Sequence, residues 1–493
     1  MPFKCHSCGT TLEAAPMSPS IRPRLTNQEL RARAPALDAE IARARAYLDQ
    51  VLAKREMVQN VLDAIVYPVL TLPVEITSQI FCWTLAKTGH IAFPHNLRLL
   101  GQPLHLGQIC RLWRQIALSI PQLWNHMDFV IDLNLNQPQA PSASLIHTCL
   151  SRTASSPLSL FLDATTHRTD NRTSWYAEPI LDIFAPYSKT WENVGFYTSL
   201  NSLRALSGIY KQLPRLKSLK LGLRDRKPAT PITLFEEAPL LQTVHLIKLH
   251  SQTVTLPWSQ LTVLHVEGLR AGELCGVLGL TTNLVSLIIG RALDDEANLW
   301  DLPPLPHLQS IVFTTTSLDA YQILPFLTVP RLRDLKVALS YQRDNIAQLF
   351  AHALDRLYIF IAYDRDGAWL QYLATTPPSL RTAKIVLSSR CAVILGPLLS
   401  HLTDDPTFLP GLESLAITVL RQYEEHAPVT ARVLSDMLRT RRALGLQNFE
   451  LVSSVSLPDT RLDTRIAGLV ADGMHIRVET QAEPYNDFGR PEF

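Results

Sequence analysis

The sequence predicts an α/β protein in which a long N-terminal helix and a small helical domain precede a solenoid of repeated strands. Three observations predict this fold. Apolar residues recur at alternating spacings of four and three within residues 25–68, short amphipathic segments follow within 70–127, and a six-residue pattern recurs from about residue 190. With 493 residues, the chain is long enough to bury a large core and to contain more than one structural unit.

The composition argues against several classes of protein. Charge is nearly balanced, with 46 Lys and Arg against 44 Asp and Glu, and the basic residues are scattered, so binding to nucleic acid is not expected. The seven cysteines are mostly isolated, which does not suggest a disulfide framework. No stretch is apolar and long enough to span a membrane, and the N-terminus lacks the apolar core of a secretory signal. We therefore expect a soluble protein of the cytosol or nucleus that does not bind membranes.

Both ends of the chain are expected to be disordered tails, residues 1–24 because of scattered prolines and residues 481–493 because of their polar, aperiodic sequence. Within the first tail, Cys5 and Cys8 have the spacing of half a tetrahedral zinc site. The next cysteine is Cys82, inside an apolar segment, so the second half of such a site is missing. An incidental pair of cysteines is the alternative, and the sequence leaves metal binding by Cys5 and Cys8 open.

Residues 25–68 are predicted to form one long helix. Thr26 and Glu29 fit a capping box at its start, Pro68 ends it, and Pro35 predicts a kink or a detachment of the first turns. Arg55 occupies one position of a heptad pattern that is otherwise apolar. The two interpretations are a coiled coil, within one chain or by self-association, and a single helix that packs on its own domain. The apolar heptad positions are Leu30, Ala34, Leu37, Ile41, Ala44, Leu48, Val51, Val58, Leu62 and Ile65.

A short helix is predicted to start at Leu72-Pro73. Proline is favourable in the first turn, where its missing N–H costs nothing, and Glu75 lies near the positive end of the helix dipole. The apolar face of this helix would contain Ile76, Ile80 and Phe81. Residues 86–104 contain two prolines and are predicted to be an irregular insertion.

A second helix is predicted from about Leu106 and ends before Pro121. Leu123 and Trp124 are then expected to fold onto the two helices. Helices of this size bury too little surface to be stable alone, so their remaining apolar residues are expected to bind a partner. The apolar face of the second helix contains Ile109, Leu112 or Trp113, Ile116 and Ala117.

Three motifs in this order resemble the F-box over residues 70–127. They are Leu72-Pro73-x-Glu75-Ile76-(x)3-Ile80-Phe81, then Ile109-Cys110-(x)2-Trp113-Arg114-x-Ile116-Ala117, and then Pro121-x-Leu123-Trp124. The F-box is the adaptor-binding motif of substrate receptors in cullin-RING ubiquitin ligases, and the insertion here is longer than in compact members. The resemblance implies that this region binds a Skp-family adaptor, and a cullin through it. The residues implied to contact the adaptor are Leu72, Pro73, Glu75, Ile76, Ile80, Phe81, Ile109, Trp113, Pro121, Leu123 and Trp124.

A hexad of the form apolar-x-x-apolar-x-apolar recurs from about residue 190, within a predicted solenoid of residues 150–480. Each hexad is predicted to be a short strand whose last two apolar residues point into a core, followed by a helix or loop on the outer side. A period of about 24 residues is typical of leucine-rich repeats, although the usual asparagine is absent and the spacing drifts. Residues 155–163 resemble an earlier capping strand. The alternative is a set of unrelated strands in an ordinary α/β domain. The hexads start at residues 191, 216, 241, 261, 284, 308, 332, 354, 380, 412 and 446.

No catalytic motif is recognisable: a phosphate loop, a nucleophile elbow, a zinc-protease helix and a dinucleotide fingerprint are all missing from the sequence. The carboxylate groups Glu236-Glu237 and 294–296 lie between strands and are expected to be solvated. Cys391 lacks an activating neighbour beyond Arg390, and the fifteen histidines lack metal-ligand spacing. Three histidines of the F-box insertion are expected to be solvated or to lie in the core: His90, His95 and His105. We expect no cofactor and no catalytic activity; an enzyme would require residues far apart in sequence to converge.

These expectations combine into a non-catalytic substrate receptor of a Skp-cullin-F-box type ubiquitin ligase, with an unknown protein as the target of the repeats. Polar residues at the variable hexad positions are expected to line the concave face of the solenoid. The alternative function is a protein-interaction scaffold with leucine-rich repeats and no ligase role. The predicted concave-face residues are Lys220, His245, His265, Lys336 and Lys384.

Overall fold

The computed structural model of the chain describes residues 3–4, 11–12, 26–63, 68–86, 98–131, 142–164, 172–223, 230–291, 302, 304–314, 327–339, 352–362, 369–388, 390–420, 431–453 and 464–480. The chain forms two compact units, residues 1–73 and residues 74–493. The boundary falls inside the region that resembles an F-box, directly after Pro73. Cys5, Cys8, His90, His95 and residues 294–296 lie outside the described residues.

The first unit is built around α1 (Asn27–Asp63). The predicted capping box is confirmed, because the Thr26 amide donates to Glu29 Oε2 at 2.7 Å and the Glu29 amide donates to Thr26 Oγ1 at 3.4 Å. The helix continues through Pro35, so the predicted detachment of the first turns is wrong; a single lost backbone hydrogen bond does not end the helix. A 3-10 helix, η1 (Pro68–Thr71), follows. In the segment predicted to be disordered, β1 (Phe3–Lys4) pairs antiparallel with β2 (Thr11–Leu12).

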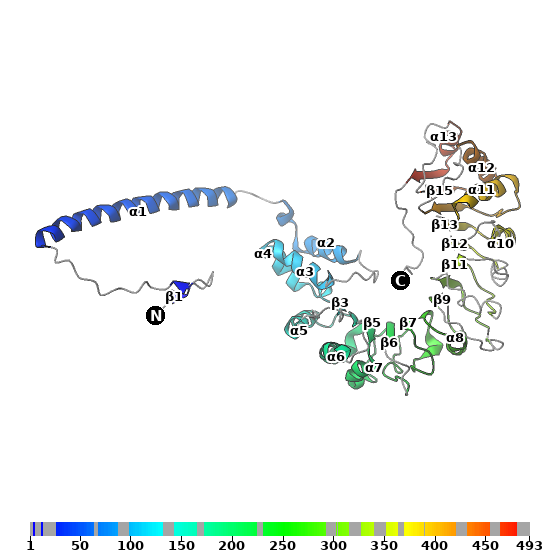
Figure 1. Cartoon of the computed structure of the whole chain (residues 1–493), viewed down its shortest axis with the longest axis horizontal. Coiled ribbons are helices and arrows are strands. Elements are labelled where there is room, and N and C mark those ends of the chain that lie inside the picture. The colour runs from blue at the N-terminus through cyan, green and yellow to red at the C-terminus, as the bar shows by residue number, and fades with distance from the viewer. Residues whose placement is uncertain are drawn as a thin grey trace. The chain divides into compact units, whose positions relative to one another are not determined.

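The second unit contains a 14-stranded sheet in which the strands follow chain order and all neighbouring pairs are parallel (Figure 1). The mixed α/β class and the long N-terminal helix are therefore confirmed. The strands are β3 (His126–Val130), β4 (Leu158–Asp163), β5 (Trp191–Thr198), β6 (Ser218–Leu223), β7 (Thr243–Ile247), β8 (Val263–Glu267), β9 (Ser286–Ile289), β10 (Ser310–Phe313), β11 (Asp334–Leu339), β12 (Arg356–Ile361), β13 (Thr382–Leu387), β14 (Ser414–Val419), β15 (Asn448–Ser453) and β16 (His475–Thr480).

Every predicted hexad overlaps a strand of this sheet, and the predicted capping strand is β4. The hexad that starts at Leu241 shows why the pattern works. Leu241, Val244 and Leu246 are all fully buried, because alternate residues of a strand point to the same face and the leading leucine fills the turn before it. The same apolar positions repeat in the next strand, so neighbouring repeats share a continuous core that extends from Phe81 to Met474.

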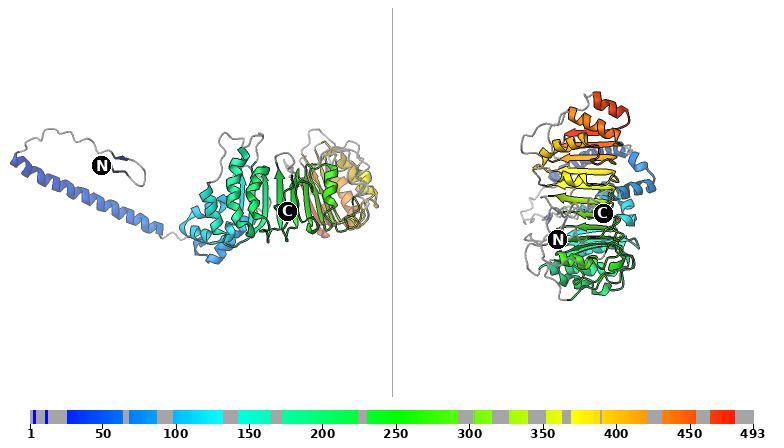
Figure 2. Two further views of the ribbon diagram at one scale, coloured as in Figure 1. Left: turned by 90° about the horizontal axis from the view of Figure 1, so that it is seen from below. Right: turned by 90° about the vertical axis from the view of Figure 1, so that its right-hand side faces the viewer.

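Helices connect many of the strands and lie along one side of the sheet (Figures 1 and 2). Such crossovers are required because a parallel strand cannot be reached through a tight hairpin. None of the described helices has both the length and the apolar character needed to span a membrane. The crossover helices are α5 (Ala143–Arg152), α6 (Arg172–Phe184), α7 (Leu200–Arg204), α8 (Ala271–Leu278), α10 (Leu370–Ala374), α11 (Leu395–Asp404), α12 (Ala431–Ala443) and α13 (Thr464–Ala471), with 3-10 helices η3 (Ala185–Thr190), η4 (Ala205–Ile209), η5 (Trp258–Gln260) and η9 (Ala392–Ile394).

The second unit begins with α2 (Val74–Ala86), α3 (Arg98–Ile109), α4 (Arg111–Ser119) and the 3-10 helix η2 (Pro121–Leu123). Two predictions are wrong here. Residues 98–104 were expected to be irregular but are helical, and the helix expected from Leu106 is interrupted at Cys110, whose backbone is extended at φ −153° and ψ 170°. The Cys110 thiol caps α4 by accepting from the Trp113 amide at 3.4 Å, which accounts for the new helix start.

Candidate functional site

The helix α2 carries apolar side chains on two faces. Thr77 and Phe81 are buried, with 3% and 1% of their surfaces exposed, because they face the core. Ile76, Ile80 and Trp83 follow the i, i+4, i+7 spacing of a second face, and they are 43%, 40% and 71% exposed. The second face is therefore an apolar stripe on the surface of the second unit. We call these three residues the α2 stripe.

The buried side of this region is held together by aromatic packing and one specific hydrogen bond. Phe81 meets Trp113 edge to face, with 5.0 Å between ring centroids. The Trp124 indole N–H donates to the Ala117 carbonyl at 2.9 Å, and the Arg152 guanidinium lies 4.7 Å from the Trp124 ring centroid. Because Arg152 belongs to α5, these contacts connect the small helices to the sheet.

The residues implied to contact the adaptor occupy three environments. Trp113 and Pro121 are half-buried, whereas Phe81, Leu123 and Trp124 are buried inside the unit. A buried side chain offers no surface to a partner, so those three residues act from within, by supporting the helices. The exposed residues are Leu72 and Pro73 in the first unit, and Glu75, Ile76, Ile80 and Ile109 in the second.

Sequence reasoning missed the exposed apolar residue Trp83. Trp83 could have been found by continuing the spacing of Ile76 and Ile80 for one more turn. The choice between Leu112 and Trp113 was left open by the sequence. The structure places Trp113 against Phe81 and leaves Leu112 38% exposed.

The face of the sheet opposite the buried hexad residues carries a row of side chains in register. All five predicted concave-face residues belong to this row, because each follows the same apolar position of its hexad and the strands pair without a shift between β6 and β13. Across these strands, the row consists of Lys220, His245, His265, Ile288, Val312, Lys336, Tyr358 and Lys384.

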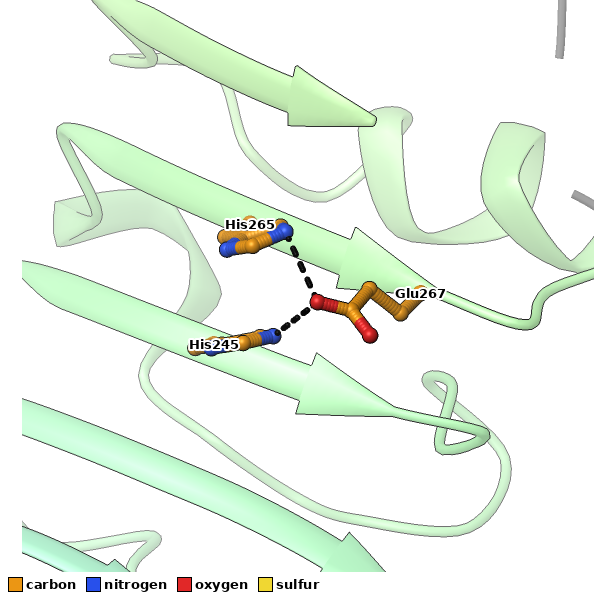
Figure 3. A group of neighbouring side chains, drawn as sticks. All are labelled: His245, His265 and Glu267. Atoms are coloured by element: carbon orange, nitrogen blue, oxygen red, sulfur yellow. Dashed lines mark hydrogen bonds and ion pairs between the residues drawn. The ribbon is translucent and has the colours of Figure 1, made fainter. Parts of the chain in front are cut away.

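His245, His265 and Glu267 form a polar cluster within this face (Figure 3). His245 and His265 are register partners on β7 and β8, and Glu267 lies two residues after His265 on the same face. Glu267 Oε1 is 3.1 Å from His245 Nε2 and 3.2 Å from His265 Nε2. The imidazole rings stack with centroids 3.7 Å apart and planes 11° apart. Sequence analysis assigned both histidines to this face but did not recognise that they meet Glu267.

Burial determines the protonation of the cluster. Removal from water lowers the pKa of His245 to about 4, although its hydrogen bond with Glu267 opposes the shift. The hydrogen bond from His245, reinforced by His265, holds the pKa of Glu267 well below its usual range. Burial also lowers the pKa of Lys220, against the attraction of the Glu267 and Asp163 charges. At neutral pH, the cluster therefore combines a neutral His245 with an ionised Glu267.

The three side chains have the donor types of a metal site, and one ligand atom from each lies within 4.8 Å of the others. A bound metal must lie close to the plane of each imidazole, along the lone pair of its nitrogen. The two ring planes are nearly parallel and the rings are stacked, so one ion cannot lie in both planes. The observed arrangement favours hydrogen bonding to a carboxylate over metal coordination.

A second group in the row surrounds Tyr358. The Lys336 and Lys384 ammonium groups lie 4.7 Å and 5.1 Å from the Tyr358 ring centroid, one from each neighbouring strand. The face therefore offers cationic, aromatic and carboxylate groups at fixed spacings. Of these groups, the half-buried Lys336, Tyr358 and Lys384 can contact another protein, whereas His245 and His265 are buried.

Other predicted positions show no comparable grouping among the residues that the structure describes. Glu236 and Glu237 are exposed, and Glu237 pairs with Lys211 at 2.8 Å. His105 is exposed, and Cys391 is buried.

No protein-family model matches the chain, and a search of curated proteins also finds no match. The function must therefore be argued from the residues and their geometry.

Proposed function

We propose that this chain is the substrate-recognition subunit of a Skp-cullin-F-box type ubiquitin ligase. The region of α2 to α4 binds a Skp-family adaptor, and the sheet face binds a protein target. The observation that carries the proposal is the α2 stripe: a helix whose inner face already completes the core still presents Ile76, Ile80 and Trp83 to solvent. Exposed apolar groups of this kind mark surfaces that bind other proteins.

The energetics are consistent with docking. Burying one large apolar side chain contributes about 1.5–3 kcal/mol, so the stripe contributes several kcal/mol in a complex. Association costs about 4–15 kcal/mol in lost freedom of motion, so further contacts from Ile109 and Leu112 are required. Trp83 is the most exposed of the stripe residues, and tryptophan is the residue type most enriched among binding hot spots.

The second part of the proposal is that the sheet belongs to a leucine-rich-repeat solenoid. It is supported by the parallel pairing of strands in chain order and by the recurrence of each hexad at a spacing of about 24 residues. In a solenoid, the half-buried members of the register row lie on one extended binding surface. The polar members among them are Lys220, Lys336, Tyr358 and Lys384. The receptor acts by proximity: it holds a target close to a ligase that performs the chemistry.

The proposal is tested by capture of a purified Skp-family adaptor on the immobilised full-length chain. We expect binding by the wild type and at least a tenfold loss in Ile76→Asp and Trp83→Asp, because each change places a charge on the docking surface. Leu240→Asp is the matched control, since Leu240 is 47% exposed but lies between β6 and β7. Absence of wild-type binding, or equal binding by all variants, would refute the proposal.

The alternative is a scaffold that binds proteins but has no ligase role. It is supported by α1, a long helix with no buried residue, because such a helix can assemble with another protein without any contribution from the F-box-like region. Reconstitution separates the two functions. A receptor recruits the cullin in the presence of the adaptor, whereas a scaffold fails to recruit it even when its other binding partners are present.

A further inference from the structure

The helix α1 carries its apolar heptad positions on its surface. None of its 37 residues is buried, and the large aliphatic side chains at those positions are 43–58% exposed. A helix of this length spans about 55 Å. Packing of an apolar face supplies most of the stability of helices in proteins, so this exposed row requires a partner. The exposed residues are Leu30, Leu37, Ile41, Leu48, Val51, Val58 and Leu62.

We infer that two copies of this chain associate through α1 as a parallel, in-register coiled-coil dimer. The heptad places apolar residues at nearly all core positions, with one charged exception at Arg55. The a positions are Ala34, Ile41, Leu48, Arg55 and Leu62, and the d positions are Leu30, Leu37, Ala44, Val51 and Val58.

The charged residues at the e and g positions, beside this core, favour a parallel orientation of the two copies. In a parallel dimer, each g residue faces the e residue five positions later in the other copy. Arg33 then faces Asp38 of the second copy, and Glu40 faces Arg45 of the second copy, each pair occurring twice by symmetry. The remaining flanking pairs are Tyr47 with Leu52 and Lys54 with Gln59, so no like charges meet.

The antiparallel arrangement is less favourable at these positions. The alignment that overlaps the whole helix places Arg45 opposite Arg45 of the second copy and leaves Asp38 opposite Leu52. Its one opposite-charge pair is Glu40 with Lys54, against two such pairs in the parallel arrangement. The parallel dimer has its own cost, because Arg55 faces Arg55 of the second copy. A single charged residue at an a position fixes the register at the expense of stability, and the long aliphatic part of arginine can pack while its charge reaches water.

The inference does not depend on the ligase proposal, since α1 lies in the first unit and the proposed target surface lies in the second. A dimer carries two copies of each surface. A target or an assembly with two binding sites would then bind more tightly than it binds one copy, through effective concentration.

Sedimentation equilibrium of the full-length chain tests the association. We expect a mass of twice 55.3 kDa for the wild type and a monomer for Leu48→Glu, which places a charge at a central a position. Ala46→Glu is the matched control, because Ala46 occupies the outward f position of the same heptad, and this variant should remain a dimer. A monomeric wild type, or dimers of equal strength in all three proteins, would overturn the inference.

A charge exchange tests the orientation. Glu40→Arg alone creates repulsion with Arg45, and Arg45→Glu alone creates repulsion with Glu40, so each variant should dimerise at least tenfold more weakly than the wild type. A mixture of the two variants restores attraction at both sites and should form the heterodimer preferentially. If the mixed variants associate no better than either variant alone, the parallel in-register arrangement is wrong.

Discussion

Arg441 is a buried charge whose removal should destabilise the C-terminal repeats strongly. It lies on α12, is 1% exposed, and donates from its guanidinium to the carbonyl groups of Leu402, Asp405 and Phe408. Leu402 belongs to the last turn of α11, where carbonyl groups lack partners within the helix. The guanidinium therefore caps α11 and binds the loop that leads to β14.

The Arg441→Met variant keeps much of the aliphatic volume but loses every donor. A hydrogen bond from a charged group contributes about 1.5–3 kcal/mol, and a carbonyl left buried without a donor costs about 1–3 kcal/mol. Water entering the site recovers part of this loss. We therefore expect a destabilisation of about 3–5 kcal/mol, comparable to breaking one side of a buried ion pair.

Native-state hydrogen exchange measures this effect locally, through the opening free energy of amides in α11 and α12. The matched control is Arg442→Met, because Arg442 is the next residue, is only half-buried, and donates to a single exposed carbonyl at Asp472. The control should change the opening free energy by less than about 1 kcal/mol. Equal effects of the two substitutions would refute the reasoning that the buried hydrogen bonds stabilise this region.

Three further predictions follow from individual side chains. The pKa of His245 is about 4 in the folded state, below the ordinary histidine value of about 6.5. The unfolded chain therefore binds the proton first, and stability should fall by about 1.6 kcal/mol from pH 6.5 to pH 5. Urea unfolding at each pH should show this fall, and His245→Gln should reduce it; an unchanged slope in the variant would contradict the assignment. Gly195→Ala places a Cβ in steric conflict with the Phe161 ring and should cost about 1–3 kcal/mol in urea unfolding. In Gly208→Ala the new Cβ meets no atom within 4 Å, so this variant should cost little. If Gly208→Ala is as harmful as Gly195→Ala, crowding is not the cause. Arg55→Leu should strengthen the α1 dimer in sedimentation experiments by removing the like-charge pair, and a weaker dimer would contradict its assignment to a core position.

The strands were predictable because their signal is local. In the hexad that begins at Leu241, six residues contain both the leading leucine and the alternation of apolar and polar side chains. This pattern can be recognised without knowing which residues the strand contacts. The strand β3 was missed although Trp124, Met127 and Phe129 complete a hexad, because Trp124 was assigned to the helical domain. The strand β16 was missed because Gly473 occupies the leading position of its hexad. The interruption at Cys110 was missed because the apolar pattern continues across it without a break.

The functional surfaces were only partly predictable because they depend on tertiary contacts. Ile80 and Phe81 are adjacent and equally apolar, and only the position of Trp113 determines that Phe81 is the buried one. His245 and His265 are in contact because β7 and β8 pair in register, and the sequence of a single hexad does not specify the register of two strands. The burial of Arg441 was missed because arginine is normally exposed, although Arg441 continues the i, i+3, i+4, i+7 spacing of the buried residues Leu434, Met437 and Leu438.

The central claim is that the α2 stripe becomes buried against a Skp-family adaptor. Calorimetric titration of the full-length chain with the purified adaptor at several temperatures tests it most directly, because burial of apolar surface gives a negative heat-capacity change of binding. The claim predicts saturable binding with one adaptor for each chain, a negative heat-capacity change, and loss of binding in Trp83→Asp. Absence of saturable binding, or binding with no change in heat capacity that survives Trp83→Asp, would contradict it.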